Sequence, residues 1–163
     1  LGDVYKRQMS VREGLEFESV IESDSASLND LVNSIRKAGT IHTLRDPTRG
    51  GVSSALNELA DASNHGFVID EKSLPIREQV RGACELLGLD PLYVANEGKL
   101  LAFVKEEDAE SVLQSMRQHP MGREAEIIGE VVDNHPGMVV LKSRVGGTRV
   151  VDMITGEQLP RIC

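Results

Sequence analysis

The sequence predicts an α/β domain, arranged as an α+β sandwich with helices packed on a mixed sheet. Helix-like and strand-like apolar patterns alternate along the chain, and turn residues such as Gly, Pro and Asn separate them. Alternating elements of this kind build layers in which helices cover a sheet. A length of 163 residues, of which 40% are hydrophobic, suits one such domain with its own core.

Four segments carry apolar residues at the spacing of an amphipathic helix. We expect these helices to end near Gly39, residues 64–66, Gly88 and residues 119–120, because Gly, Asn and Pro disfavour further helix there. The apolar stripes are Leu28-Leu31-Val32-Ile35, Val52-Ala55-Leu56-Leu59-Ala62, Val80-Cys84-Leu87 and Ala109-Val112-Leu113-Met116.

Six short apolar segments are expected to form strands. One of them, residues 100–104, is almost wholly apolar, which is typical of a strand buried on both faces. The other five are residues 41–44, 67–69, 127–132, 138–141 and 149–153.

The composition excludes several classes of function. With 26 acidic and 18 basic residues the formal charge is −8, which repels nucleic-acid phosphates, and 3% aromatic residues are too few for base stacking. No run of about 18 apolar residues and no signal pattern occur, so we expect no membrane span and a cytoplasmic location. The four histidines share no ligand spacing, so no metal site is predicted.

The chain is expected to divide into four parts. Residues 1–8 match none of the later patterning and are interpreted as a non-native remnant. Residues 9–24 are interpreted as the end of a preceding domain followed by an acidic linker. Residues 25–152 form the predicted domain, and residues 153–163 a flexible tail.

The first candidate site is the strand-to-helix turn with the sequence Asp-Pro-Thr-Arg-Gly-Gly. Its proline keeps Asp46 extended, and Thr48 could cap the helix that follows. Gly50 and Gly51 allow a ligand to approach the unpaired amides of the first helical turn, and Arg49 adds positive charge. The sequence thus predicts an anion site, or a helix start whose glycines serve only tight packing.

The second candidate is the Asn96-Glu97-Gly98 turn before the apolar strand. Asn96 and Glu97 would present polar groups at a sheet edge, although the same residues also suit an ordinary turn.

The two cysteines are too few for a disulfide framework. Cys84 shares a helix face with Val80 and Leu87, so we interpret it as a core residue. Cys163 is the last residue, at the tip of the predicted tail, where a thiol could serve as a carried nucleophile or could simply belong to a frayed terminus. Arg161 favours its thiolate and the terminal carboxylate opposes it, so help from another site is needed.

These motifs together resemble the HypE family of hydrogenase maturation proteins. The Asp-Pro-Thr-Arg-Gly-Gly turn, the Asn-Glu-Gly turn and the terminal Pro-Arg-Ile-Cys occur in the family's order, over residues 9–163. The family belongs to the superfamily of aminoimidazole ribonucleotide synthetase and selenophosphate synthetase. Its terminal cysteine is the most specific of the three motifs.

The resemblance implies an ATP-dependent carbamoyl dehydratase. A carbamoyl group placed on Cys163 would be phosphorylated by ATP and dehydrated to a thiocyanate, the cyanide source for the iron of [NiFe]-hydrogenase. Glu97 matches the family's general base, and Asp46, Thr48, Arg49, Gly50, Gly51 and Asn96 would face the nucleotide.

The resemblance also implies partners. These are the carbamoyltransferase HypF, the iron scaffold of HypC and HypD, and a second copy in a homodimer. An N-terminal domain, which supplies most of the ATP and Mg²⁺ site in this family, is missing, so we expect the chain alone to be inactive.

Two alternatives stay open. The chain could belong to a phosphotransfer enzyme of the same superfamily, such as a selenophosphate synthetase, or it could be an acidic module that binds partners without catalysis. The terminal cysteine argues against the first alternative.

Overall fold

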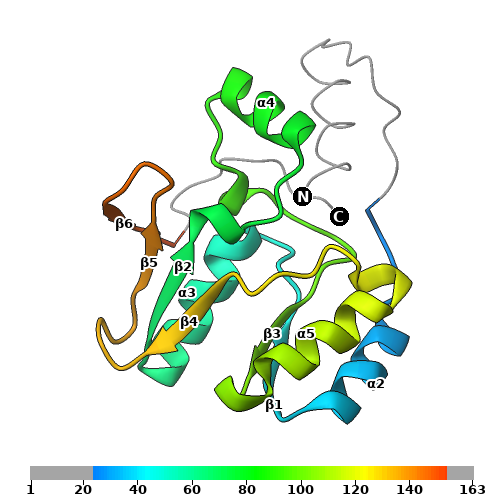
Figure 1. Ribbon diagram of the computed structural model, residues 1–163. Coiled ribbons are helices and arrows are strands. Elements are labelled where there is room, and N and C mark those ends of the chain that lie inside the picture. Colours follow the sequence, from blue (N-terminus) through cyan, green and yellow to red (C-terminus); the bar gives the residue numbers. More distant parts are fainter. Residues whose placement is uncertain (1–23, 154–163) are drawn as a thin grey trace.

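Two β-sheets organise residues 24–153, the part of the chain that this computed structural model describes (Figure 1). The larger sheet has the strand order β4-β2-β5-β6, and the smaller consists of β1 and β3. The strands are β1 (Ile41–Arg45), β2 (Gly66–Asp70), β3 (Leu101–Val104), β4 (Gly129–Val132), β5 (Val139–Lys142) and β6 (Thr148–Val150).

The predicted fold class is confirmed, with one difference in the sheet. The larger sheet is mixed, because β2 pairs parallel with β5 whereas β2–β4 and β5–β6 are antiparallel. The strands do not form the single sheet that we expected, since β1 pairs only with β3 among the described strands. Strand β6 is also shorter than predicted, ending at Val150.

All four predicted helices are present. They are α2 (Asn29–Ala38), α3 (Gly51–Ser63), α4 (Glu78–Leu87) and α5 (Ala109–Gln118). Short 3₁₀ turns, which the apolar pattern did not predict, occur at Glu71–Ser73 (η1), Pro91–Tyr93 (η2), Glu106–Asp108 (η3) and Pro120–Gly122 (η4). No helix in the described range is long and apolar enough to cross a membrane.

The main core lies between α3 and the larger sheet. Val52 and Leu56 of α3 pack on the inward residues of β2 and β5, including Phe67 and Val139. The ring of Phe67 lies 5.1 Å from that of Phe103 in β3, so the small sheet joins the same core.

Strand β3 contacts hydrophobic residues on both faces, as its sequence predicted. Leu101 and Phe103 pack on the main core, whereas Ala102 and Val104 pack under α2 and α5. Its side chains are nevertheless only partly buried in the described part of the chain. Helices α2 and α5 lie side by side over it through Leu31, Ile35 and Val112 (Figure 1).

Cys84 fills a separate small core, as predicted. It is 2% exposed and packs in α4 with Val80 and with Val94, which follows η2. Burial raises the pKa of the Cys84 thiol, and the charge of Asp90 raises it further, so the thiol stays protonated at neutral pH.

Asp108 links the start of α5 to the turn before β1. Its Oδ2 accepts a 2.8 Å hydrogen bond from the N–H of Thr40, which lowers the pKa of Asp108. A lowered folded-state pKa stabilises the fold above the unfolded pKa of about 3.9, and this stabilisation is lost as the pH falls through the folded-state pKa. We expect Asp108→Asn to lower the urea midpoint at pH 7, and the gap to the parent to close below about pH 3.9.

The matched control for this prediction is Asp133→Asn, which removes an exposed carboxylate from the loop after β4. It should leave the urea midpoint unchanged at every pH. A gap between Asp108→Asn and the parent that widens on acidification would contradict the role of the Thr40 hydrogen bond.

Candidate functional site

The two motif turns predicted from the sequence are direct neighbours. The N–H of Asn96 donates a 3.1 Å hydrogen bond to the carbonyl of Pro47, which is fully buried. This bond joins the Asp-Pro-Thr-Arg-Gly-Gly turn after β1 to the Asn-Glu-Gly turn before β3. Residues 49 positions apart in sequence thereby form one site.

The first turn exposes its charged side chains and buries its glycines. Asp46 and Arg49 are exposed, whereas Gly50 and Gly51 are buried. Arg49 has no acidic partner in the described part of the chain. Arg45, the last residue of β1 before the turn, pairs with Glu58. Arg49 is therefore the cation of this turn that is available to an anionic ligand.

The expectation that Thr48 caps α3 is wrong. The N-cap is Gly50, with φ of 74°, and no side chain caps the helix. The N–H of Gly51 donates to the carbonyl of Thr48 at 3.0 Å, so the backbone of the turn, not its hydroxyl, satisfies the first amide. Glycine is required at the cap because this φ is rare for residues with a side chain.

Gly51 is needed for close packing. Its φ is +63°, and a Cβ placed there would lie 2.5 Å from the carbonyl oxygens of both Leu92 and Val94. Helix α3 thus begins directly against η2 and the residue that follows it, the segment that leads to Asn96. Close packing therefore requires glycine at position 51, and its predicted role in an anion site stays a prediction.

Asn96 and Glu97 differ in exposure. Asn96 is 1% exposed, and its Nδ2 donates to the carbonyl of Val94 at 2.8 Å, while its Oδ1 is buried without a hydrogen-bond partner in the described structure. Glu97 is half-buried. Asn96 thus holds the turn, and Glu97 is its partly accessible carboxylate.

The sequence did not predict that Asp24 supports the second turn. Its Oδ2 accepts a 3.2 Å hydrogen bond from the N–H of Glu97. Gly98 has φ of +58°, and a Cβ there would lie 2.0 Å from the carbonyl oxygen of Asp24. The backbone of Glu97 is consequently fixed on both sides, by Asp24 and by the Asn96–Pro47 bond.

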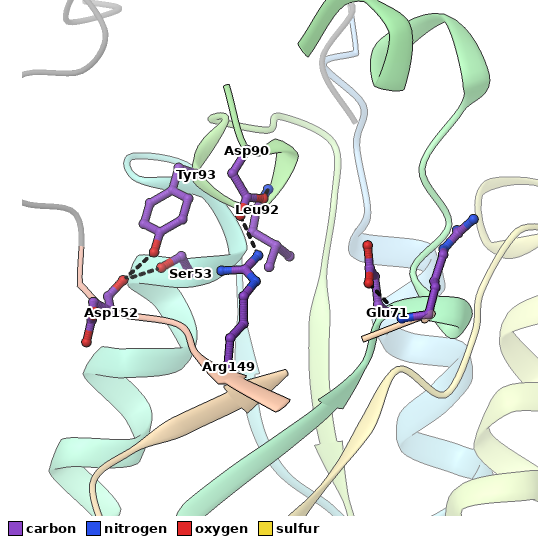
Figure 2. Close-up of polar contacts among 8 residues, drawn as sticks. Ser53, Glu71, Asp90, Leu92, Tyr93, Arg149 and Asp152 are labelled. Atoms are coloured by element: carbon purple, nitrogen blue, oxygen red, sulfur yellow. Dashed lines mark hydrogen bonds and ion pairs between the residues drawn. The ribbon is translucent and has the colours of Figure 1, made fainter. Parts of the chain in front are cut away.

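Three polar side chains hold the backbone beyond β6, and sequence patterns did not identify them. The hydroxyls of Ser53 and Tyr93 donate to the carbonyl of Asp152 at 2.8 and 3.0 Å, and both point at this oxygen in Figure 2. Asn57 Nδ2 donates to the carbonyl of Val151 at 2.8 Å. We call Ser53, Asn57 and Tyr93 the tail clamp. The i, i+4 spacing of Ser53 and Asn57 on one helix face was the only sequence signal.

Some predicted features do not join this site. Cys163 lies outside the described residues, as do the predicted remnant and most of the predicted linker. Within the described range, no group of three or more His, Cys, Asp or Glu side chains could hold a metal ion. A shallow hollow of about 300 Å³ on the outer face of the larger sheet is lined by residues such as Val68 and Val140 and contains none of the predicted site residues.

A family described as "AIR synthase related protein, C-terminal domain" matches residues 6–142. The chain belongs to this family. Membership agrees with the α/β fold and places both motif turns inside the family's domain.

Relatives in the family are HypE proteins. Carbamoyl dehydratase HypE of Cupriavidus necator is 53% identical over 156 residues, which are 95% of this chain and 44% of that protein. Carbamoyl dehydratase HypE of Azotobacter vinelandii is 54% identical over 164 residues, covering 100% of this chain and 48% of that protein. The chain spans about half the length of these curated relatives.

Solved HypE structures are also similar to this chain. A crystal structure of hydrogenase maturation protein HypE matches with a TM-score of 0.92 and 46% identity, covering 100% of this chain and 53% of that one. HypE in complex with ATP matches at a TM-score of 0.87 and 46% identity, over 95% of this chain and 48% of that one. The crystal structure of a HypE–HypF complex matches with a TM-score of 0.87 and 43% identity, covering 94% of this chain and 50% of that one. The resemblance to HypE is thus confirmed.

Proposed function

We propose that this chain is the C-terminal portion of an ATP-dependent carbamoyl dehydratase that converts an S-carboxamide on its own Cys163 to a thiocyanate. The observation that carries the proposal is the hydrogen-bonded contact between the two motif turns, one of which carries Glu97, in a sequence that has a cysteine at position 163. The close relatives named carbamoyl dehydratase support it.

The proposed chemistry has two steps. The carboxamide oxygen on Cys163 attacks the γ-phosphorus of ATP, which releases ADP and leaves an O-phosphorylated imidate. The C–O bond then breaks, phosphate departs, and a C≡N bond forms while the C–S bond to Cys163 is kept. Both amide N–H protons are lost in the process, so a base within hydrogen-bond reach is required.

We assign the base to Glu97. Its carboxylate is half-buried, and its backbone is fixed by Asp24 and by the neighbouring Asn96, so it is positioned without the entropy cost of ordering a loop. Arg49, exposed and without an acidic partner among the described residues, is suited to contact phosphate oxygens. Asp46 and Thr48 flank it on the same turn.

The residues at the start of α3 fit a nucleotide only in part. The amide of Gly51 already donates to Thr48, and its Cα side is packed against η2. We therefore propose that Gly50 and Gly51 shape the turn that presents Arg49. We propose that the longer protein binds ATP, which the solved HypE–ATP complex supports. We further propose that most contacts to ATP and Mg²⁺ come from an N-terminal domain.

We also propose the partners of the longer protein. The carbamoyltransferase would be HypF, a proposal supported by the solved HypE–HypF complex. The acceptor of the cyano group would be an iron scaffold of HypC and HypD, and the enzyme would act as a homodimer in the cytoplasm.

The test follows the mass of the longer protein in the presence of ATP, carbamoyl phosphate and the carbamoyltransferase. We expect the intact mass to rise by one carbamoyl group and then to fall by one water. Cys163→Ala should abolish both changes, because the modified sulfur is gone.

Cys84→Ala is the matched control. It removes the buried cysteine and should leave both mass changes in place. Identical mass changes in Cys163→Ala would refute the proposed function, since the carbamoyl group would then reside elsewhere.

A further inference from the structure

Asp24 contacts the Asn-Glu-Gly turn at two points. Its Oδ2 accepts the N–H of Glu97 at 3.2 Å, and its carbonyl oxygen lies 2.0 Å from the place that a Cβ on Gly98 would take. The backbone nitrogen of Ala26 lies 2.9 Å from the same place, so residues 24–26 run directly along the turn. One short segment thus forms a wall beside the residue that carries the proposed base.

The Asp24 hydrogen bond differs from those that Asp70 and Asp90 make. Each of these two accepts the N–H of the residue two positions later, Lys72 or Leu92, as aspartates do in ordinary turns. Asp24 instead accepts from a residue 73 positions away. Its carboxylate therefore holds a distant turn and does not shape the chain around itself.

The second oxygen of the Asp24 carboxylate, Oδ1, is buried and has no hydrogen-bond partner among the described residues. A buried carboxylate oxygen without a donor is costly, and a neutral serine or asparagine side chain could accept the same N–H without burying a charge. A hydrogen bond to a charged acceptor, however, is roughly twice as strong as a neutral one. The carboxylate thus favours a firm hold on the Glu97 N–H over stability of the fold.

Other contacts already anchor the turn. Asn96 donates its N–H to the carbonyl of Pro47 at 3.1 Å and its Nδ2 to the carbonyl of Val94 at 2.8 Å. Asp24 acts one peptide later, on the plane between Asn96 and Glu97, and so sets the direction of the Glu97 side chain. Direction matters steeply for a catalytic group, because a misplacement of about 1 Å can cost roughly 10²-fold in rate.

We propose that Asp24 is a positioning residue for the base Glu97. Its Oδ2 fixes the peptide that precedes Glu97, and this directs the Glu97 carboxylate at the substrate amide. Asp24 does not contact the reacting atoms, because one of its oxygens is bonded to the turn and the other is buried. This inference rests on the proposed function, in which Glu97 is the base.

The first test measures hydrogen exchange of the Glu97 N–H by NMR in the 163-residue chain. In Asp24→Ala we expect this amide to exchange at least about ten-fold faster, the factor expected for the loss of one charge-assisted hydrogen bond. Asp24→Asn keeps an acceptor oxygen without the charge, so its exchange rate should lie between those of the parent and Asp24→Ala.

Asp70→Ala is the matched control for the exchange measurement. It also removes one carboxylate and one carboxylate–amide hydrogen bond, at the start of η1. The exchange of the Glu97 N–H should stay at the parent rate in this variant. Parent-like exchange in Asp24→Ala would overturn the proposal, since the Asp24 bond would then not restrain Glu97.

The second test uses the longer enzyme, carbamoylated on Cys163 and mixed with ATP, under conditions in which every variant is folded. Asp24→Ala should lower kcat for thiocyanate formation by about ten- to a hundred-fold, with an unchanged KM for ATP. Asp24→Asn should restore most of the lost rate, because it still accepts the Glu97 N–H, and Asp70→Ala should react like the parent.

The outcomes separate this inference from the proposed function. If the parent forms no thiocyanate, the proposed function fails, and the exchange of the Glu97 N–H alone decides whether Asp24 restrains this residue. If the parent reacts and Asp24→Ala reacts equally fast, the positioning role fails and the function stands. A purely structural role would lower the unfolding midpoint of Asp24→Ala without lowering kcat, and that result would also overturn the proposal.

Discussion

Replacing Glu97 with Gln is expected to stop the reaction at the carboxamide. In the longer enzyme, supplied with ATP and the carbamoyl donor, the protein mass should rise by one carbamoyl group and then stay there. A glutamine amide cannot accept the N–H protons that dehydration releases, and loss of a positioned general base costs roughly 10²- to 10⁴-fold in rate. Intact mass spectrometry over time measures this directly.

The substitution Glu97→Gln should remove the carboxylate without disturbing the structure of the turn. The turn is held by backbone groups, through the Glu97 N–H to Asp24 and the Asn96 N–H to Pro47, and neither bond involves the Glu97 carboxylate. The variant should therefore keep its stability within about 0.5 kcal/mol, because Gln has nearly the same shape as Glu and no described hydrogen bond uses the carboxylate. A large fall in the unfolding midpoint would mean that the carboxylate has a structural role.

Glu58→Gln is a matched control for the loss of one carboxylate. Glu58 lies on α3, where it pairs with Arg45 at the surface. This exposed pair contributes little to stability, so the variant should form thiocyanate like the parent. Thiocyanate formation at the parent rate in Glu97→Gln would remove Glu97 from the mechanism and direct attention to another base.

The helices could be predicted from the sequence because their signals are local. Each apolar stripe recurs within one segment, and Gly88 ends α4 in the left-handed conformation, with φ of 65°, as its position after the stripe suggested. Cys84 was correctly assigned to a core for the same reason.

The sheets and the site could not be predicted in full because their determinants are distant in sequence. Strand β1 pairs with β3 although about 60 residues separate Ile41 from its partner Val104, and no apolar pattern encodes that choice. Likewise, the motif turns were identified separately, but their contact through Pro47 and Asn96 is a property of the fold.

The capping residue of α3 was predicted wrongly from the local sequence. Thr48 has a hydroxyl that could accept a hydrogen bond from the first helix amides, which Gly lacks, so the sequence favoured Thr48 as the cap of α3. The chain instead places Gly50 at the cap, with φ of 74°, and starts α3 at Gly51, where a Cβ would meet the carbonyl oxygens of Leu92 and Val94. The start of α3 is thus set by glycines whose positive φ and close packing against η2 are features of the fold that residue type alone did not reveal.

That close packing leads to the second large prediction, for Gly51→Ala. The new Cβ would lie 2.5 Å from two carbonyl oxygens, those of Leu92 and Val94, at a φ of +63°. The left-handed conformation costs roughly 1–2 kcal/mol and overpacking a further 1–3 kcal/mol, so we expect a loss of about 2–5 kcal/mol in the free energy of unfolding. Urea denaturation of the 163-residue chain measures the loss.

Gly88→Ala separates the two contributions. Gly88 has nearly the same φ, +65°, but a Cβ there meets nothing within 4 Å. It should therefore lose only the conformational part, about 1–2 kcal/mol. Equal losses in free energy of unfolding would show that the segment from Leu92 to Val94 shifts to accommodate the new Cβ without further loss of stability. If Gly51→Ala loses more, the additional loss of stability measures the contact that joins α3 to η2.

That contact carries both Tyr93 of the tail clamp and the chain leading to Glu97. Gly51→Ala should therefore also slow thiocyanate formation, whereas Gly88→Ala should not.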